Sequence, residues 1–261
     1  EAIRPEDEML AARVAAGTRL DAIVSTDGDG DRPLVSDESG RWLRGDVLGV
    51  LVARFFRADV VATPVSSNTV VERCGAFGVV RRTRIGSPYV IEAMARAAAE
   101  GARAVVGYEA NGGVLTATPL RAPLGELAPL PTRDAVIVHI AVVGEAWRRR
   151  VPVSALAAEL PARFTFSDRL KDFPPEITAR RVEALRAGGD PAFAEAFPSL
   201  DAPVSRDDTD GLRWTLASGD VVHLRPSGNA PELRCYAESD TATRAARLAR
   251  EVLKIVEGWR G

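Results

Sequence analysis

Apolar residues recur at helical spacing in several parts of the chain. In residues 45–56 they fall on one face of a helix, and Asp46 stands where it can cap the first turn. The same spacing predicts further helices over residues 5–16, 67–76, 87–100, 132–149, 154–160 and 176–187. A last helix is expected to run to about Glu257. Ser87 and Asp240 are expected to cap the helices that follow them.

Short apolar or β-branched runs separate these helices. They predict strands over residues 20–24, 59–63, 79–83, 104–108, 212–216, 221–224 and 233–238, the first of them buried. Residues 167–175 are polar and contain proline, so we expect them to connect two domains. Strands and helices alternate before this connection. The expected fold class is therefore α/β, with mixed βαβ sheet domains covered by helices, followed by a smaller α+β C-terminal domain.

Composition and charge exclude several classes of protein. The 261 residues have a formal net charge of −2, and their basic residues are interspersed with acids rather than gathered in a stripe, so nucleic-acid binding is not favoured. Without a run of 18 apolar residues or a signal peptide, no membrane partner is expected. Cys74 and Cys235 are too few and too far apart for a disulfide scaffold. We expect a cytoplasmic protein with reduced thiols.

An acidic loop follows the first predicted strand. Asp27, Asp29 and Asp31 are separated by single glycines, which let the backbone curl until three carboxylates converge, an arrangement that suits Mg²⁺ or Ca²⁺. An EF-hand is a poor match, because Arg32 stands where its loop requires glycine. The other alternative is a solvated Asp/Gly turn without a ligand.

A glycine-rich turn follows the strand predicted over residues 104–108. Ligands of open α/β sheets bind at such strand ends, and Glu109 and Asn111 can hydrogen-bond sugar hydroxyls there. The alternative is a plain turn with an exposed acid. His139 lies in an apolar helix and His223 in a strand, so both are expected to be structural.

A third loop, residues 225–232, joins two predicted strands. Arg225 supplies a guanidinium fork, Ser227 a hydroxyl and Asn229 an amide, next to free backbone N–H groups at Gly228, which together can cradle a phosphate. Arg234 can add a second fork. The alternative is an ordinary tight turn between two strands.

The three loops, in this order, resemble those of a known family. Asp27-Gly-Asp-Gly-Asp-Arg, Gly107-Tyr-Glu-Ala-Asn-Gly-Gly and Arg225-Pro-Ser-Gly-Asn-Ala-Pro-Glu are similar to the metal, sugar and phosphate loops of the α-D-phosphohexomutases, the phosphomannomutases and phosphoglucomutases. Members of this family have four domains. The resemblance implies that residues 1–44 end the second domain, 45–165 form the third and 166–261 the fourth.

The resemblance also implies a reaction and its residues. Family members interconvert hexose 1-phosphate and hexose 6-phosphate, of mannose or glucose, through a phosphoserine enzyme and a bisphosphate intermediate. The implied Mg²⁺ ligands are Asp27, Asp29 and Asp31, with Arg32 beside them as possible catalytic support. The implied substrate contacts are Glu109, Asn111, Arg225, Ser227, Gly228, Asn229 and Arg234.

Some family features are missing. Asn111 and Gly113 stand where the family's sugar loop usually has serine and histidine, and Asn229-Ala230 where its phosphate loop commonly has Thr-Glu or Thr-Thr. No serine precedes either histidine, so the phosphoserine loop is absent. We therefore expect the chain to be a C-terminal fragment, inactive alone, whose partner is the missing N-terminal segment. The alternative is a non-catalytic phosphosugar-binding module.

Overall fold

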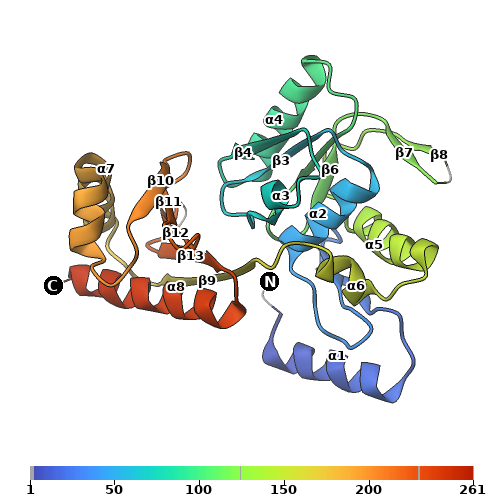
Figure 1. The fold of residues 1–261 in the computed structure, drawn as a ribbon, viewed down its shortest axis with the longest axis horizontal. Coiled ribbons are helices and arrows are strands. Elements are labelled where there is room, and N and C mark those ends of the chain that lie inside the picture. The colour runs from blue at the N-terminus through green and yellow to red at the C-terminus, as the bar shows by residue number, and fades with distance from the viewer. Residues whose placement is uncertain (1–2, 124, 229, 261) are drawn as a thin grey trace. The chain divides into compact units, whose positions relative to one another are not determined.

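The chain forms two compact units. The computed structural model describes residues 3–123, 125–228 and 230–260 (Figure 1), and the chain divides into unit 1, residues 1–161, and unit 2, residues 162–261. Each unit is described by itself.

Unit 1 contains a four-stranded mixed sheet with strand order β4-β3-β5-β6. Its central strand, β3 (Val60–Pro64), runs parallel to β4 (Val79–Thr83) and β5 (Val105–Tyr108), while β6 (Val114–Thr116) is antiparallel to β5. The sheet is thus mixed, as the alternation of strands and helices predicted.

Helices cover both faces of this sheet. Val61 and Val106 lie in one core with α2 (Gly45–Phe55) and α5 (Ala135–Arg149). Their strand neighbours face the other way, because successive strand residues alternate, and they pack against α4 (Ser87–Ala99) in a second core. These layers confirm the expected α/β class.

Smaller elements complete unit 1. They are α1 (Pro5–Gly17), β1 (Val24–Thr26), β2 (Pro33–Val35), α3 (Val70–Arg73), β7 (Leu120–Ala122), β8 (Gly125–Leu127) and α6 (Val153–Ala158). The buried strand expected over residues 20–24 is wrong. The strand is β1, all three of its residues are exposed, and within the described residues it pairs with β2 alone. The three strands β6, β7 and β8 were not expected.

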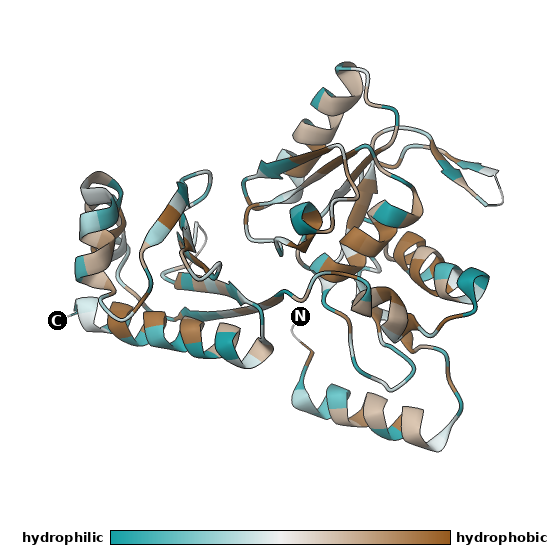
Figure 2. Cartoon of the chain, in the orientation of Figure 1, coloured by the Kyte–Doolittle hydropathy of each residue, from teal (hydrophilic) through white to brown (hydrophobic). Residues whose placement is uncertain are grey.

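Unit 2 is a five-stranded antiparallel sheet packed on helices. Its strand order is β10-β11-β12-β13-β9. The strands are β9 (Phe164–Leu170), β10 (Pro203–Asp207), β11 (Leu212–Leu216), β12 (Val221–Pro226) and β13 (Leu233–Ser239), and the helices are α7 (Pro175–Ala196) and α8 (Ala242–Glu257). Trp214 is fully buried against Phe193 and Phe197, with ring centroids 5.0 and 6.3 Å away. Figure 2 shows hydrophobic and hydrophilic patches alternating along α8, as expected for a helix with one buried face.

The connection expected over residues 167–175 is wrong, because all of these residues lie within unit 2. Residues up to Leu170 belong to β9, which pairs with β13 along its whole length. The sequence is polar here because β9 is an edge strand whose side chains are largely exposed, and this polarity suggested a connection instead of a strand. The helix predicted over residues 176–187 continues to Ala196 across a break at Gly189, where φ is 61°.

Three predicted helix caps are also wrong. Arg44, Gly86 and Thr241 are the N-cap residues where Asp46, Ser87 and Asp240 were expected. Asp46 is buried and instead accepts a hydrogen bond from Asn68 N at 3.1 Å. The helix expected over residues 67–76 is only the single turn α3. The backbone N–H of Asn68 bonds to Asp46, so the helix begins after it, and Gly75, with φ of 62°, ends it.

Among the described residues, no helix is both long enough and apolar enough to cross a membrane.

Candidate functional site

The acidic loop is a closed turn between β1 and β2. Asp27 N donates to Arg32 O at 3.2 Å, and Arg32 N donates to Asp27 Oδ1 at 3.2 Å. Gly30 N donates to Asp27 O at 3.1 Å, and its φ of 75° is a conformation that glycine adopts without strain. The glycines therefore do let the backbone curl.

The three carboxylates of this loop have different surroundings. Asp29 is exposed, whereas Asp27 Oδ2 and Asp31 Oδ1 lie 3.5 and 3.7 Å from Arg32 Nε. The second oxygen of Asp31 lies 2.5 Å from Arg133 Nη2. Among the described residues, no group of three His, Cys, Asp or Glu side chains is gathered as metal ligands.

The chemistry of the loop nevertheless fits a hard divalent cation. Its donors are carboxylate oxygens, which Mg²⁺ and Ca²⁺ prefer. Asp31 Oδ1 is buried and accepts no hydrogen bond from any residue that the structure describes. An unsatisfied buried acceptor is costly, and a cation at this oxygen would satisfy it.

The glycine-rich turn lies at the carboxyl end of β5, as predicted. Gly112 N donates to Glu109 O at 2.9 Å, and Gly113 N donates to Asn111 Oδ1 at 3.0 Å. Asn111 thus stabilises the turn itself. Glu109 is buried, with a residue exposure of 7%, so it is not the exposed acid of the plain-turn alternative.

Arg133 brings the acidic loop and this turn together. Besides Asp31, it contacts Glu109, with Nη1 3.0 Å from Oε2. Its stem also fills the space beside Gly113, where a Cβ would lie 2.7 Å from Arg133 Cδ. Sequence reasoning missed this role. The only signal was the stretch Pro131-Thr-Arg-Asp134, whose last residue caps α5 by accepting from Val136 N at 2.7 Å.

The start of α2 packs directly on the same turn. A Cβ on Gly45 would lie 2.3 Å from Gly112 N, so the two backbones touch. Because Gly112 also has a φ of 91°, both positions require glycine. This contact fixes the turn that carries Glu109.

The third loop belongs to unit 2 and joins β12 to β13. Ser227 N donates to Glu232 O at 2.9 Å, which closes the loop. Arg225 is opposite Arg234 in the strand register, and Arg234 is opposite Arg169 of β9. Opposite residues of antiparallel strands point to the same face, so three guanidinium groups emerge beside this loop. Asn229, also proposed from the sequence, lies outside the described residues.

Acidic side chains hold these arginines. Arg225 Nε lies 3.0 Å from Asp210 Oδ2, and Glu232 contacts both Arg234 and Arg169, at 3.2 and 3.3 Å. Neither Asp210 nor the double role of Glu232 was predicted.

The two histidines make structural contacts. His223 stacks on Tyr236 with centroids 5.2 Å apart, and burial lowers its pKa to about 4, although its hydrogen bond to Asp210 O opposes this shift. Since a carbonyl oxygen only accepts, Nε2 carries the proton and donates at 2.6 Å. His139 Nε2 in the same way lies 3.0 Å from Ser25 O in unit 1.

Comparison with known proteins agrees with this fold. Residues 44–164 match the model of phosphoglucomutase/phosphomannomutase alpha/beta/alpha domain III, and residues 150–255 match the model of the C-terminal domain. An α/β layer unit followed by an antiparallel unit is the domain III and domain IV pair of these enzymes. The chain belongs to the phosphoglucomutase/phosphomannomutase family.

Individual relatives are similar over nearly all of this chain. A phosphomannomutase of Salmonella muenchen is 40% identical over 261 residues, which are 100% of this chain and 54% of that protein. A phosphoglucomutase/phosphomannomutase family protein of Burkholderia thailandensis has the same fold, with a TM-score of 0.71 at 18% identity over 98% of this chain and 51% of that one. Aspergillus fumigatus N-acetylphosphoglucosamine mutase, solved with GlcNAc-6P and magnesium, gives 0.60 at 17% identity, covering 93% and 49%. The chain thus spans about half the length of its relatives.

Proposed function

We propose that this chain supplies the sugar-binding and phosphate-binding domains of a phosphohexomutase. The whole enzyme would interconvert the 1-phosphate and 6-phosphate of mannose or glucose through a phosphoserine and a bisphosphate intermediate. Support comes from the family match and from relatives that are named as phosphomannomutases. The domain limits at residues 44 and 165 remain a prediction, as does a cytoplasmic location.

One observation carries the phosphate assignment, namely the row of Arg225, Arg234 and Arg169 across three strands. A phosphate dianion offers three oxygens to the forked donors of such a row. The hydroxyl of Ser227 and the backbone N–H of Gly228 lie in the loop between the first two arginine-bearing strands. We propose that these groups, with Asn229, hold the phosphate that is not reacting.

In unit 1, we propose that Glu109 accepts hydrogen bonds from sugar hydroxyls, in a turn that Asn111 stabilises. Asp27, Asp29 and Asp31 would hold Mg²⁺ beside Arg32, in line with the magnesium of the Aspergillus mutase structure. When bound, Mg²⁺ supplies positive charge that stabilises the transferring phosphoryl group. Arg133 would keep Asp31 and Glu109 at a fixed separation, because it contacts both.

The phosphate assignment is tested by calorimetric titration of the chain with glucose 6-phosphate and with glucose. The phosphate ester should bind and the free sugar should not. Arg225→Ala should weaken binding by roughly 10- to 150-fold, the equivalent of one or more hydrogen bonds to a charged group. Arg206→Ala is the matched control. Arg206 lies on β10, and its Nε is likewise paired with an aspartate, 2.8 Å from Asp208 Oδ1. Equal affinity for the two ligands would end the assignment.

The catalytic half of the proposal is tested by a coupled mutase assay. The chain by itself, supplied with Mg²⁺ and hexose 1,6-bisphosphate, should not turn over, because covalent transfer needs a nucleophile that accepts and returns phosphate. Turnover that rises with the concentration of the purified chain and vanishes in Asp29→Asn would show that the nucleophile lies within these residues.

A further inference from the structure

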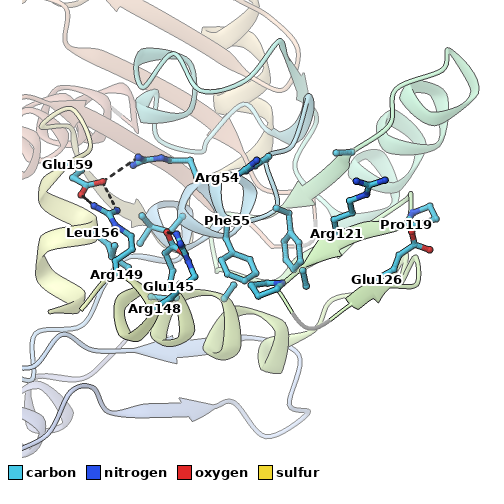
Figure 3. Close-up of a pocket in the computed structure, with 18 of the residues that line it drawn as sticks. Arg54, Phe55, Pro119, Arg121, Glu126, Glu145, Arg148, Arg149, Leu156 and Glu159 are labelled. Atoms are coloured by element: carbon cyan, nitrogen blue, oxygen red, sulfur yellow. Dashed lines mark hydrogen bonds and ion pairs between the residues drawn. The ribbon is translucent and has the colours of Figure 1, made fainter. Parts of the chain in front are cut away.

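A pocket of about 780 Å³ lies in unit 1, away from the loops described above. It is bordered by the end of α2, the second half of α5, α6 and the β7–β8 hairpin (Figure 3). We call it the amino-edge pocket, because Arg57 and Arg103, which line it, lie three and two residues before the first residues of β3 and β5. Glu109 follows the last residue of β5. A ligand in the pocket and a sugar at Glu109 would therefore lie at opposite ends of that strand.

The lining of the amino-edge pocket carries a positive charge. Six arginines and three glutamates line it, a difference of three charges. At one end of the pocket, Arg54 and Arg149 both form ion pairs with Glu159, and Arg148 donates two hydrogen bonds to Glu145. The other three arginines are Arg57, Arg103 and Arg121, and among the described residues their side chains make no ion pair. The third glutamate, Glu126, is opposite Arg121 in the register of β7 and β8 and offsets part of its charge. An excess of arginines around a concave site attracts anions.

Arg57 has an unusual backbone. Its φ is 52°, a left-handed conformation that ends α2, with Ala58 N donating to Ala53 O at 2.9 Å. Glycine usually occupies this position because a side chain there is strained. In this conformation the side chain of Arg57 lines the pocket. Arg150 ends α5 with a φ of 55° but does not line the pocket, which makes it a matched control.

The remaining lining is largely apolar. Leu51 of α2 and Leu156 of α6 contribute to it, and Figure 3 shows the ring of Phe55 between the paired charges and Arg121. An inorganic anion alone would leave this surface unused, and a sugar would place hydroxyls against it. The volume lies within the roughly 300–1,000 Å³ of small-molecule sites, so the ligand has room for a flat ring as well as an anionic end.

We propose that the amino-edge pocket binds a nucleoside di- or triphosphate, with its phosphates on Arg57, Arg103 and Arg121 and its base against Phe55. Guanidinium forks match phosphate oxygens, and aromatic rings stack on bases. This second site belongs to unit 1 alone and does not depend on the phosphate loop of unit 2. A nucleotide there can therefore bind together with a sugar phosphate.

The proposal is tested by calorimetry on the full chain with ADP, pyrophosphate, adenosine and glucose 6-phosphate. ADP should bind more tightly than pyrophosphate or adenosine, and saturating glucose 6-phosphate should not displace it. Arg57→Gly should weaken ADP binding at least about tenfold without lowering the melting temperature, since it also relieves the left-handed strain. Arg150→Gly should leave ADP binding unchanged. Arg121→Ala, at an exposed side chain, should weaken it as Arg57→Gly does.

Four results would overturn the proposal. The first is that ADP fails to bind at millimolar concentration, and the second is that Arg57→Gly binds ADP as the wild type does. The third is that pyrophosphate matches ADP, because the apolar surface would then contribute nothing. The fourth is displacement of ADP by glucose 6-phosphate, which would place the nucleotide on the sugar phosphate site instead. Failure of glucose 6-phosphate to bind would count only against the proposed function.

Discussion

Arg133 Nη2 lies 2.5 Å from Asp31 Oδ2, so one guanidinium holds the acidic loop. The same group contacts Glu109, whose side chain is only 9% exposed. These contacts join two loops that are 78 residues apart in the chain, counted from residue 31 to residue 109. The stability of unit 1 should depend on them.

Arg133→Met should lower the free energy of unfolding by about 1–3 kcal/mol, because it leaves two carboxylates without their donor. Arg96→Met is the matched control. Arg96 also pairs with a glutamate, at 2.9 Å, but its side chain is 78% exposed, and such surface pairs contribute about 0–1 kcal/mol. Urea unfolding measures both. An Arg133→Met protein as stable as the control would contradict the contact.

Magnesium should bind the acidic loop weakly. Because Arg133 occupies one oxygen of Asp31, calorimetric titration of Mg²⁺ should give at best about millimolar affinity. Asp29→Asn should abolish binding, whereas Asp21→Asn, at an exposed aspartate before β1, should not. Arg133→Met should strengthen binding by freeing that oxygen. Micromolar affinity that persists in Asp29→Asn would refute the assignment.

Protonation of His223 should destabilise unit 2. Burial lowers its pKa from 6.5 to about 4, so the unfolded chain takes up a proton first as the pH falls. The stability that neutral His223 provides is complete above about pH 6.5 and is lost progressively down to about pH 4. The full loss is on the order of 3 kcal/mol. His223→Gln keeps a donor for Asp210 O and should remove this dependence.

The measurement is urea unfolding at pH 7, 5.5 and 4, followed by the fluorescence of Trp214 in a background where Trp42, Trp147 and Trp259 are replaced by phenylalanine. Carboxylates also titrate in this range, so the informative quantity is the difference between wild type and His223→Gln. Two parallel curves would mean that His223 takes up its proton equally in both states.

Gly45→Ala should be strongly destabilising. Its new Cβ would lie 2.3 Å from Gly112 N, and overpacking of this kind costs about 1–3 kcal/mol. Gly144→Ala is the matched control, because Gly144 also lies in a helix but has nothing within 4 Å of its Cβ position. That change should stabilise the chain by about 0.5–1 kcal/mol. Thermal unfolding distinguishes the two, and similar melting temperatures would contradict the backbone contact.

Sequence patterns located the elements that are apolar along one face or throughout. The helix over residues 87–100 agrees with α4 to within about a residue, because its apolar face repeats with the period of the helix. The helix over residues 45–56 and the strand over residues 104–108 agree as closely with α2 and β5, which are apolar on more than one face and are bounded by polar residues or glycine. Strand β9 could not be found in this way. Its partner, β13, lies more than 60 residues away, and its own sequence shows an exposed edge.

The candidate site was predictable only in part for a similar reason. The three loops were visible because glycine and the polar or charged residues of each are adjacent in sequence. Arg133, Asp210 and Arg169 were not, because each acts on a loop from a distant part of the chain. Motifs record neighbours in sequence, whereas these residues are neighbours only in the fold. The amino-edge pocket collects residues from five separate stretches in the same way.

The pairing of β9 with β13 has a consequence for synthesis on the ribosome. Leu170 pairs with Leu233 and Phe164 with Ser239, so β9 emerges 63 to 75 residues before its partner. At a synthesis rate of about 5–20 residues per second, β9 stays unpaired for roughly 3–15 seconds. The unpaired strand carries polar side chains, which oppose pairing with a nascent chain on the next ribosome; they are those of Thr165, Ser167, Asp168 and Arg169. The feature that hid β9 from periodicity analysis would thus protect the growing polypeptide from aggregation.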